Sequence, residues 1–311
     1  MQTILGANGQ IGEELARELK RNFTSGIRIV SRKATKINDT DEVFSADLSI
    51  REKAIEAVKG SETAYFTLGL PISSDLWEQQ FPLILQNVID ACKINGTRLV
   101  FFDNTYMYPQ DERILNEETV FEPVGRKGRV RKQMAEMVLK EMQSGELEAV
   151  ICRAPEFYGP GKTQSITNTF VFNNIKADKR LKVPVRADKK RSLIWTPDAS
   201  RATALIGNTP EAFGQTWHLP VDDSHLTYKE FIALAADIYS RELKYTVVPE
   251  TFFTIAALFN TKVKELQELL PRYKHDNIFD DSKFRKRFPA FQVTTYRQGI
   301  AAIKNEHNIK A

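Results

Sequence analysis

The sequence has little of what marks secreted, membrane-spanning or metal-binding proteins. Its 311 residues include only two cysteines and four histidines, which give no spacing typical of a zinc site and no disulfide framework. Both cysteines, Cys92 and Cys152, lie in apolar runs and are interpreted as reduced core residues. No apolar run approaches the length that spans a bilayer, and no secretory leader precedes the first expected strand. We therefore expect a cytoplasmic protein without a metal site or a membrane partner.

Strong charge of one sign is also missing. The net charge is +4 and the basic residues are spread along the chain, so nucleic acid is not an expected partner. Hydrophobic residues make up 42% and charged residues 27%, which is ordinary for a globular protein with a substantial core. We expect a small molecule as the main ligand.

What the chain does have is a glycine-rich turn close to its beginning. The turn follows a short apolar stretch, Thr3–Leu5, and leads into a segment with Leu15, Ala16 and Leu19 on one helical face. A strand, a glycine turn and a helix start form the setting in which backbone N–H groups bind a pyrophosphate. The glycine spacing is one residue longer than the general G-x-G-x-x-G pattern, and a purely structural turn is the alternative. The expected phosphate-binding residues are Gly6, Asn8, Gly9, Gln10, Ile11 and Gly12.

The residues after the second expected strand bear on the identity of the dinucleotide. Ser31, Arg32 and Lys33 suit a 2′-phosphate, which arginine can bind through two N–H groups, so we favour NADP over NAD. Two solvated loop cations are the alternative. Asp47, followed by Leu48, is placed near the adenine or as the cap of the next helix. The expected cofactor site is completed by Thr67, Leu68 and Gly69 after a further strand.

Strands and helices are expected to alternate as far as about residue 158. This alternation predicts an α/β fold with a doubly wound parallel sheet, and a cleft closed by a smaller lobe. We place the dinucleotide-binding domain at 1–158, with parts of 183–220 returning to it, and the substrate-binding lobe mainly at 159–311. Expected strands are 3–6, 27–31, 43–46, 63–68, 98–103 and 148–153; expected helices are 10–22, 50–59, 75–95, 128–143, 166–178, 198–207, 227–240, 250–258 and 261–270.

Several fragments in their order along the chain resemble the extended short-chain dehydrogenase/reductases, and more narrowly the NAD-dependent epimerase/dehydratase family. The resemblance implies a Rossmann-type fold and hydride transfer on a polar, sugar-like or carbonyl-bearing small molecule. It covers nearly the full length. The fragments are the glycine turn, Leu99 to Pro109, Arg153 to Gly161, Arg191 to Ala199 and Asp281 to Lys283.

The segment that would carry the family's catalytic Tyr-x-x-x-Lys departs from the pattern. Lys132 fits the lysine that holds the nicotinamide ribose, but the residue four positions earlier is Gly128. The family's serine position falls on Asn104, with Thr105 beside it. The chain therefore resembles an atypical member, in which the usual proton relay through tyrosine is missing.

Three interpretations of the missing tyrosine stay open. In the first, Tyr106 or Tyr108 supplies the phenol while Thr105 or Asn104 holds the substrate. In the second, Lys132 or Lys127 is the general acid or base, with a pKa lowered by neighbouring cations. In the third, the protein binds a dinucleotide without chemistry, as a sensor or regulatory protein.

Five cations crowd positions 126–132, at the start of the same expected helix. Cations there oppose the helix dipole, so either the helix end is solvated or an anion from cofactor or substrate offsets them. The family resemblance implies that this helix and 75–95 form a homodimer interface.

The expected substrate lobe departs from the family as well. Glu156 stands where the family has an asparagine that contacts a nucleotide-sugar phosphate, which weakens a nucleotide sugar as substrate. Arg191 remains as a candidate anion-binding residue. His218 is interpreted as a core histidine in preference to a base.

Overall fold

A seven-stranded parallel sheet forms the centre of the larger of two lobes. The computed structural model describes residues 1–309, and the strand order is β10-β6-β5-β4-β1-β2-β3 with parallel pairing throughout. The predicted doubly wound sheet is thereby confirmed. Its strands are β1 (Gln2–Leu5), β2 (Ile27–Ser31), β3 (Glu42–Ser45), β4 (Thr63–Phe66), β5 (Arg98–Asp103), β6 (Ala149–Arg153) and β10 (Thr216–His218).

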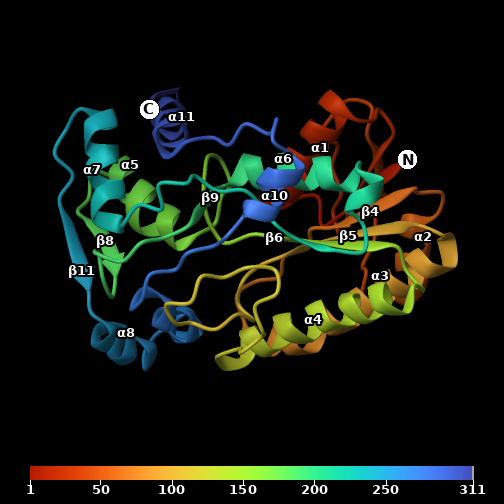
Figure 1. Cartoon of the computed structure of the whole chain (residues 1–311), viewed down its shortest axis with the longest axis horizontal. Helices are drawn as coiled ribbons and strands as arrows, with labels where there is room; N and C mark the ends of the chain where they lie inside the picture. Colours follow the sequence, from red (N-terminus) through yellow and green to blue (C-terminus); the bar gives the residue numbers. More distant parts are fainter. Residues whose placement is uncertain (310–311) are drawn as a thin grey trace.

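Helices cover both faces of this sheet (Figure 1). On one face lie α1 (Gln10–Asn22) and α6 (Thr196–Gly207); on the other lie α2 (Arg51–Val58), α3 (Ser74–Asn95) and α4 (Gly125–Ser144). Each face has its own buried apolar cluster, with Leu15 and Leu19 in one and Leu85 and Val88 in the other. Because both faces are covered, β1, β4 and β6 are buried along their whole length, which explains their short continuous apolar sequences.

The smaller lobe contains helical segments within a few residues of the predicted ranges 166–178, 227–240, 250–258 and 261–270, together with short strands that were not predicted. Two pairs of parallel strands join β7 (Glu156–Tyr158) to β9 (Leu193–Trp195) and β8 (Leu181–Pro184) to β11 (Tyr245–Val248). A third apolar cluster lies beneath them. Its helical segments are η1 (Asn168–Phe172), α5 (Asn173–Lys176), α7 (Tyr228–Tyr239), α8 (Glu250–Ala257), α9 (Thr261–Leu266), η3 (Gln267–Tyr273) and α11 (Tyr296–Ile309). Two further segments, η2 (Pro210–Ala212) and α10 (Ser282–Arg287), pack against α6 and β10 of the larger lobe.

The chain crosses between the lobes more than once. After β7 to β9 it returns to the large lobe through α6 and β10, and β10 pairs with β6. The residues 216–218 therefore lie in the central sheet, inside the range that we expected to return. Within residues 1–309, no helix is both long and apolar enough to cross a membrane.

Helix α4 begins three residues before the predicted start because carboxylates from the smaller lobe cap it. Glu268 accepts hydrogen bonds from the backbone N–H groups of Arg126 and Lys127. Arg126 also pairs with Asp75 and Glu78 on α3. The repulsion at this helix end is thus offset by the protein's own carboxylates, a third solution beside the solvated end and the external anion that the sequence suggested.

Candidate functional site

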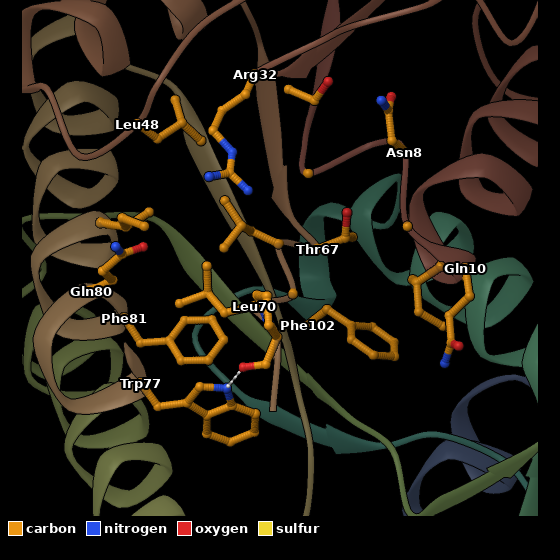
Figure 2. Close-up of a pocket in the computed structure, with 18 of the residues that line it drawn as sticks. Asn8, Gln10, Arg32, Leu48, Thr67, Leu70, Trp77, Gln80, Phe81 and Phe102 are labelled. Carbon is orange, nitrogen blue, oxygen red and sulfur yellow. Dashed lines mark hydrogen bonds between the residues drawn. The ribbon is translucent and has the colours of Figure 1, made fainter. Parts of the chain in front are cut away.

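A cavity of about 1080 Å³ lies at the carboxyl ends of the central strands. The order of the sheet reverses between β1 and β4, and in open α/β sheets such a switch point is where ligands bind. Side chains from β2, α3 and the loops around β4 and β5 point into it (Figure 2). Three residues of the smaller lobe close its other side, namely Phe157, Lys162 and Gln164.

The glycine turn borders the cavity and is held tightly in place. Gly6 has φ +91°, and a Cβ there would lie 2.4 Å from the Cα of Leu68 on the neighbouring loop. Gly12 is packed against Ala7, where a Cβ would approach to 2.5 Å. Gly9 has no such obstruction and faces the cavity. Gly6 and Gly12 therefore fix the path of the turn, and Gly9 leaves its backbone open to a ligand.

The end of the cavity near β2 carries a buried hydroxyl, a guanidinium and a carboxylate. The hydroxyl oxygen of Ser31 is buried and has no hydrogen-bond partner within residues 1–309, so a ligand hydroxyl or phosphate would satisfy it. Arg32 points into the cavity (Figure 2) and forms no ion pair with any described residue. Asp47 lies beside it, and hydrogen bonds from Ser49, together with Arg32, lower the pKa of the Asp47 carboxyl.

Most of the predicted cofactor residues come together along this cavity. Gly12 and Lys132 do not line it. Those that do are Gly6, Asn8, Gly9, Gln10, Ile11, Ser31, Arg32, Asp47, Leu48, Thr67, Leu68 and Gly69.

The opposite end of the cavity is largely aromatic. Trp77 and Phe81 of α3 face Phe102 of β5 and Phe157 of the smaller lobe, and Trp77 donates from Nε1 to the carbonyl of Pro71 (2.9 Å). None of these side chains was identified from the sequence, because single aromatic residues at strand and helix ends give no pattern.

Polar groups at the aromatic end come from β5 and α4. The side-chain oxygen of Asn104 accepts from the N–H of Tyr106 (2.9 Å), so its amide NH₂ remains available to donate into the cavity. Arg131 also lines the cavity and donates from Nε to Asp103 (3.1 Å). This end can therefore hold an oxygen atom by hydrogen bonds from an amide and a guanidinium.

From α4, Arg131 lines the cavity and the predicted Lys132 does not. The side chain of Arg131 is 5% exposed and faces the cavity, whereas that of Lys132 is 38% exposed and pairs with Glu136 on the outer face. Gly128 lies where α4 packs closely on the loop after β5. A Cβ there would lie 2.8 Å from the backbone oxygen of Tyr106, so no larger side chain fits.

One turn before Arg131, the cavity-facing side of α4 carries Lys127. Its ammonium is buried and bonded to Glu265 (2.6 Å), Glu268 (3.2 Å) and Ser74 (3.3 Å). Lys127 does not line the cavity, so its place in the structure is an ion-pair cluster between the lobes.

Behind the cavity, a buried network continues from Asp103. Arg153 donates to Asp103 and to the hydroxyl of Tyr108 (2.7 Å), which lies 2.8 Å from Nε2 of His218. The other ring nitrogen of His218 meets the carbonyl of Asp280, and burial lowers the pKa of His218 well below its usual value. His218 is thus a neutral core residue, as predicted, and Tyr108 is equally buried.

Tyr106 and Thr105 lie one layer away from the cavity. The ring of Tyr106 stacks on Trp77, and the guanidinium carbon of Arg272 lies 5.0 Å from the centroid of the Tyr106 ring. Burial raises the pKa of its hydroxyl, so Tyr106 is a phenol and not a phenolate at neutral pH. Neither residue lines the cavity.

Glu156 and Arg191 bind each other in the smaller lobe and do not line the cavity. They are 2.9 Å apart and both buried, and the hydroxyls of Tyr228 and Tyr273 also donate to Glu156. Burial alone would raise the pKa of Glu156, but Arg191 outweighs it and the pKa is lowered. Arg191 therefore already has its anion, which is supplied by the chain itself.

Comparisons with known proteins agree with this architecture. UDP-glucuronic acid 4-epimerase from Bacillus cereus, in complex with NAD, superposes with a TM-score of 0.79 over 100% of this chain and 99% of its own, at 13% identity. DesIV, a dTDP-glucose 4,6-dehydratase from Streptomyces venezuelae with NAD bound, gives 0.77 over 99% and 97%, at 13% identity. At such identities the likeness is one of fold.

A relative among curated proteins is the uncharacterized protein y4nL of Sinorhizobium fredii, 27% identical over 171 residues. The matched segment is 53% of this chain and spans about half (47%) of that relative. The family model for NAD dependent epimerases/dehydratases matches residues 3–219. Since this match covers more than half of the sequence, the chain belongs to the NAD-dependent epimerase/dehydratase family.

Proposed function

We propose that this protein binds NADP, or NAD, in the cavity and transfers a hydride to or from a sugar-like or carbonyl-bearing small molecule. The observation that carries the proposal is the layout of the cavity. At one end lie the closely packed glycine turn, the Ser31 hydroxyl without a hydrogen-bond partner, and Arg32, which forms no ion pair with a described residue. At the other end lie Asn104 and Arg131. The solved structures of similar fold named above contain NAD, which supports a nicotinamide cofactor.

The chain's own groups would hold the reactants as follows. Backbone N–H groups at the start of α1 bind the diphosphate, and Arg32 with Ser31 binds the adenosine ribose and its 2′-phosphate. Arg131 replaces Lys132 as the residue that holds the nicotinamide ribose, and the Asn104 amide donates to the substrate oxygen. A bound nicotinamide supplies the hydride chemistry.

Titration with NADPH and NADH, followed by nicotinamide fluorescence, tests this proposal. Arg32→Asp is expected to weaken NADPH binding by about tenfold or more, because a charge-assisted contact is lost and a repulsive one is gained, with little change for NADH. Equal effects on both would remove the assignment to NADP. Wild-type protein that binds neither would overturn the dinucleotide site itself.

A second candidate function is an NAD(P)-binding sensor without chemistry. It is favoured by the residues at the aromatic end, where arginine cannot give up its proton and Asp103 is held by two arginines. Within residues 1–309, no tyrosine, histidine or cysteine lines the cavity. Single-turnover oxidation of bound NADPH by a panel of carbonyl compounds separates the two candidates.

Tyr106 is the proton donor that we propose for the enzymatic candidate. Its ring stacks on Trp77, which lines the cavity. Tyr106→Phe is then expected to reduce turnover with little change in cofactor affinity. An unaltered rate would remove Tyr106 from the mechanism.

We also propose a homodimer through α3 and α4, in the cytoplasm. The two helices lie side by side on the outside of the sheet (Figure 1), and Leu83 and Ile94 of α3 are exposed apolar residues. Free, buried thiols at Cys92 and Cys152 support a reducing compartment. Light scattering of the purified protein, and of Leu83→Glu, tests the assembly: a monomer in the wild type would contradict it.

A further inference from the structure

A loop of the smaller lobe reaches across the cavity to the start of α1. Lys162 forms an ion pair with Glu13, in the first turn of α1, and the backbone N–H of Gln164 donates to the side chain of Gln10. Lys162, Gln164 and Gln10 all line the cavity, next to Gly9. The loop 161–164 therefore lies opposite the backbone that the proposed function assigns to the diphosphate.

The charges around Lys162 would let its ammonium exchange the Glu13 carboxylate for a bound anion. The first turn of a helix attracts anions through its free N–H groups, and a carboxylate beside the same N–H groups repels a second anion. Lys162 neutralises Glu13 while it faces the cavity. The side chain of Lys162 is 65% exposed and that of Glu13 is 23% exposed; because the ammonium is open to solvent, the pair contributes little to stability and can be given up at small cost.

We propose that Lys162 is a phosphate-binding residue that leaves Glu13 for the diphosphate of a nucleotide. The ammonium on its flexible four-carbon stem can reach either partner without a backbone movement. The Gln164–Gln10 hydrogen bond holds the loop in position for both. The inference rests on the proposed dinucleotide site and adds the smaller lobe to its phosphate-binding groups.

Calorimetric titration with ADP, NADH, NADPH and adenosine tests the exchange. Lys162→Met is expected to raise the dissociation constants of the three diphosphate ligands by one common factor of about three to ten, because one charged contact is lost from each. Glu13→Gln is expected to change them in the opposite direction, because the competing carboxylate is gone. Adenosine binding should not respond to either variant.

The opposite signs separate phosphate binding from a purely structural ion pair. A structural pair would make both variants weaken binding alike or leave both unchanged, and either result overturns the inference. Lys244→Met is the matched control, since Lys244 is 64% exposed and pairs with Glu242 in the same lobe away from the cavity. Melting temperatures show whether each variant is folded.

Failure of the inference differs from failure of the proposed function. If wild-type protein binds the dinucleotides and Lys162→Met binds them equally well, only the role of Lys162 is lost. If wild-type protein binds neither ADP nor a dinucleotide, the site itself is wrong and the inference falls with it.

Discussion

Arg131 and Lys132 are neighbours in sequence with opposite surroundings. Arg131 lies against Asp103 and faces the cavity, while Lys132 lies among solvent-exposed groups. A buried guanidinium needs a carboxylate beside it to offset the loss of water, whereas an exposed lysine needs no partner. Asp103, at the end of β5, could have indicated a buried cation on α4. It could not indicate which of the several cations on that helix would pair with it.

The two residues can be separated by a pair of variants. Arg131→Met leaves Asp103 with one guanidinium in place of two, so we expect the free energy of unfolding to fall by about 1–3 kcal/mol. We also expect NADPH and NADH to bind more weakly. Lys132→Met, the matched control one position away, should leave both quantities unchanged. Urea denaturation and fluorescence titration measure them, and a loss of binding in Lys132→Met would restore the register predicted from the sequence.

For Gly128→Ala, close packing and helix propensity predict opposite effects on stability. Alanine is the better helix former by about 1 kcal/mol, but its Cβ would meet the backbone oxygen of Tyr106 at 2.8 Å. We expect Gly128→Ala to destabilise the protein by about 1–3 kcal/mol, because backbone atoms must move apart. Gln133→Ala, at an exposed position of the same helix, is the control. Comparing the free energies of unfolding of the two variants separates the effect of the contact from that of helix propensity. A stabilised Gly128→Ala protein would contradict the close packing of α4 on this loop.

Breaking the Glu156–Arg191 pair should be costly for the fold. Glu156→Gln removes the charge that accompanies a buried guanidinium, so we expect a loss of about 3 kcal/mol in the free energy of unfolding. Because the neighbouring residues hold the pKa of Glu156 below its unfolded value, its contribution exists at neutral pH and is lost as the pH falls through the folded pKa. Unfolding measured from pH 7 downwards should show a shallower acid loss in the variant than in the wild type.

At the level of elements, the helices α3 and α4 begin where carboxylates of the smaller lobe meet them. Glu265 accepts hydrogen bonds from the backbone and hydroxyl of Ser74 at the start of α3, and Glu268 does the same for the backbone at the start of α4. Lys127 lies between the two carboxylates. This cluster places α9 and η3 against the wall of the cavity.

The cluster should make the joint between the lobes sensitive to acid. Burial opposes the charge of Glu265, but Lys127 and Ser74 outweigh it and lower the pKa to about 2. A carboxylate with a depressed folded pKa stabilises the protein above its unfolded pKa, and this stability is lost as the pH falls from about 4.3 towards 2. Melting temperatures of wild type and Glu265→Gln should therefore converge in that range. Curves that stay parallel down to pH 2 would contradict the assignment.

How far the elements could be predicted depended on their length and burial. The alternation of the first six strands and four helices followed from short apolar runs and helical faces, and these lie within a few residues of their predicted bounds. The glycine turn carried a local signature that placed one side of the cavity. The strands β7, β8, β9 and β11 are about as short as β1 and β4, but they lie outside the regular alternation of strands and helices, and they form only through contacts distant in sequence. The aromatic end of the cavity was missed for the same reason.

At the level of the whole molecule, the two lobes share their structure at several places. The strand β10 belongs to the central sheet but follows β7, β8 and β9 in sequence. Near the end of the chain, the backbone oxygen of Asp280 accepts a hydrogen bond from His218, and the carboxylate of Asp281 accepts one from the backbone N–H of Val221. A boundary at residue 158 therefore separates the ligand groups better than it separates the folding units. We expect thermal unfolding of the full chain to show one transition by calorimetry and by circular dichroism. Two resolved transitions would show that the lobes unfold independently.

The carboxylates that cap α3 and α4 limit how the two lobes could be exchanged by recombination. A segment ending at residue 158 would keep the glycine turn and six strands but would leave the first turns of two helices without their acceptors. Recombination that exchanged the smaller lobe for another would succeed only if the incoming lobe brought carboxylates to the same two places. The smaller lobe of this chain is thus tied to the larger lobe as a pair.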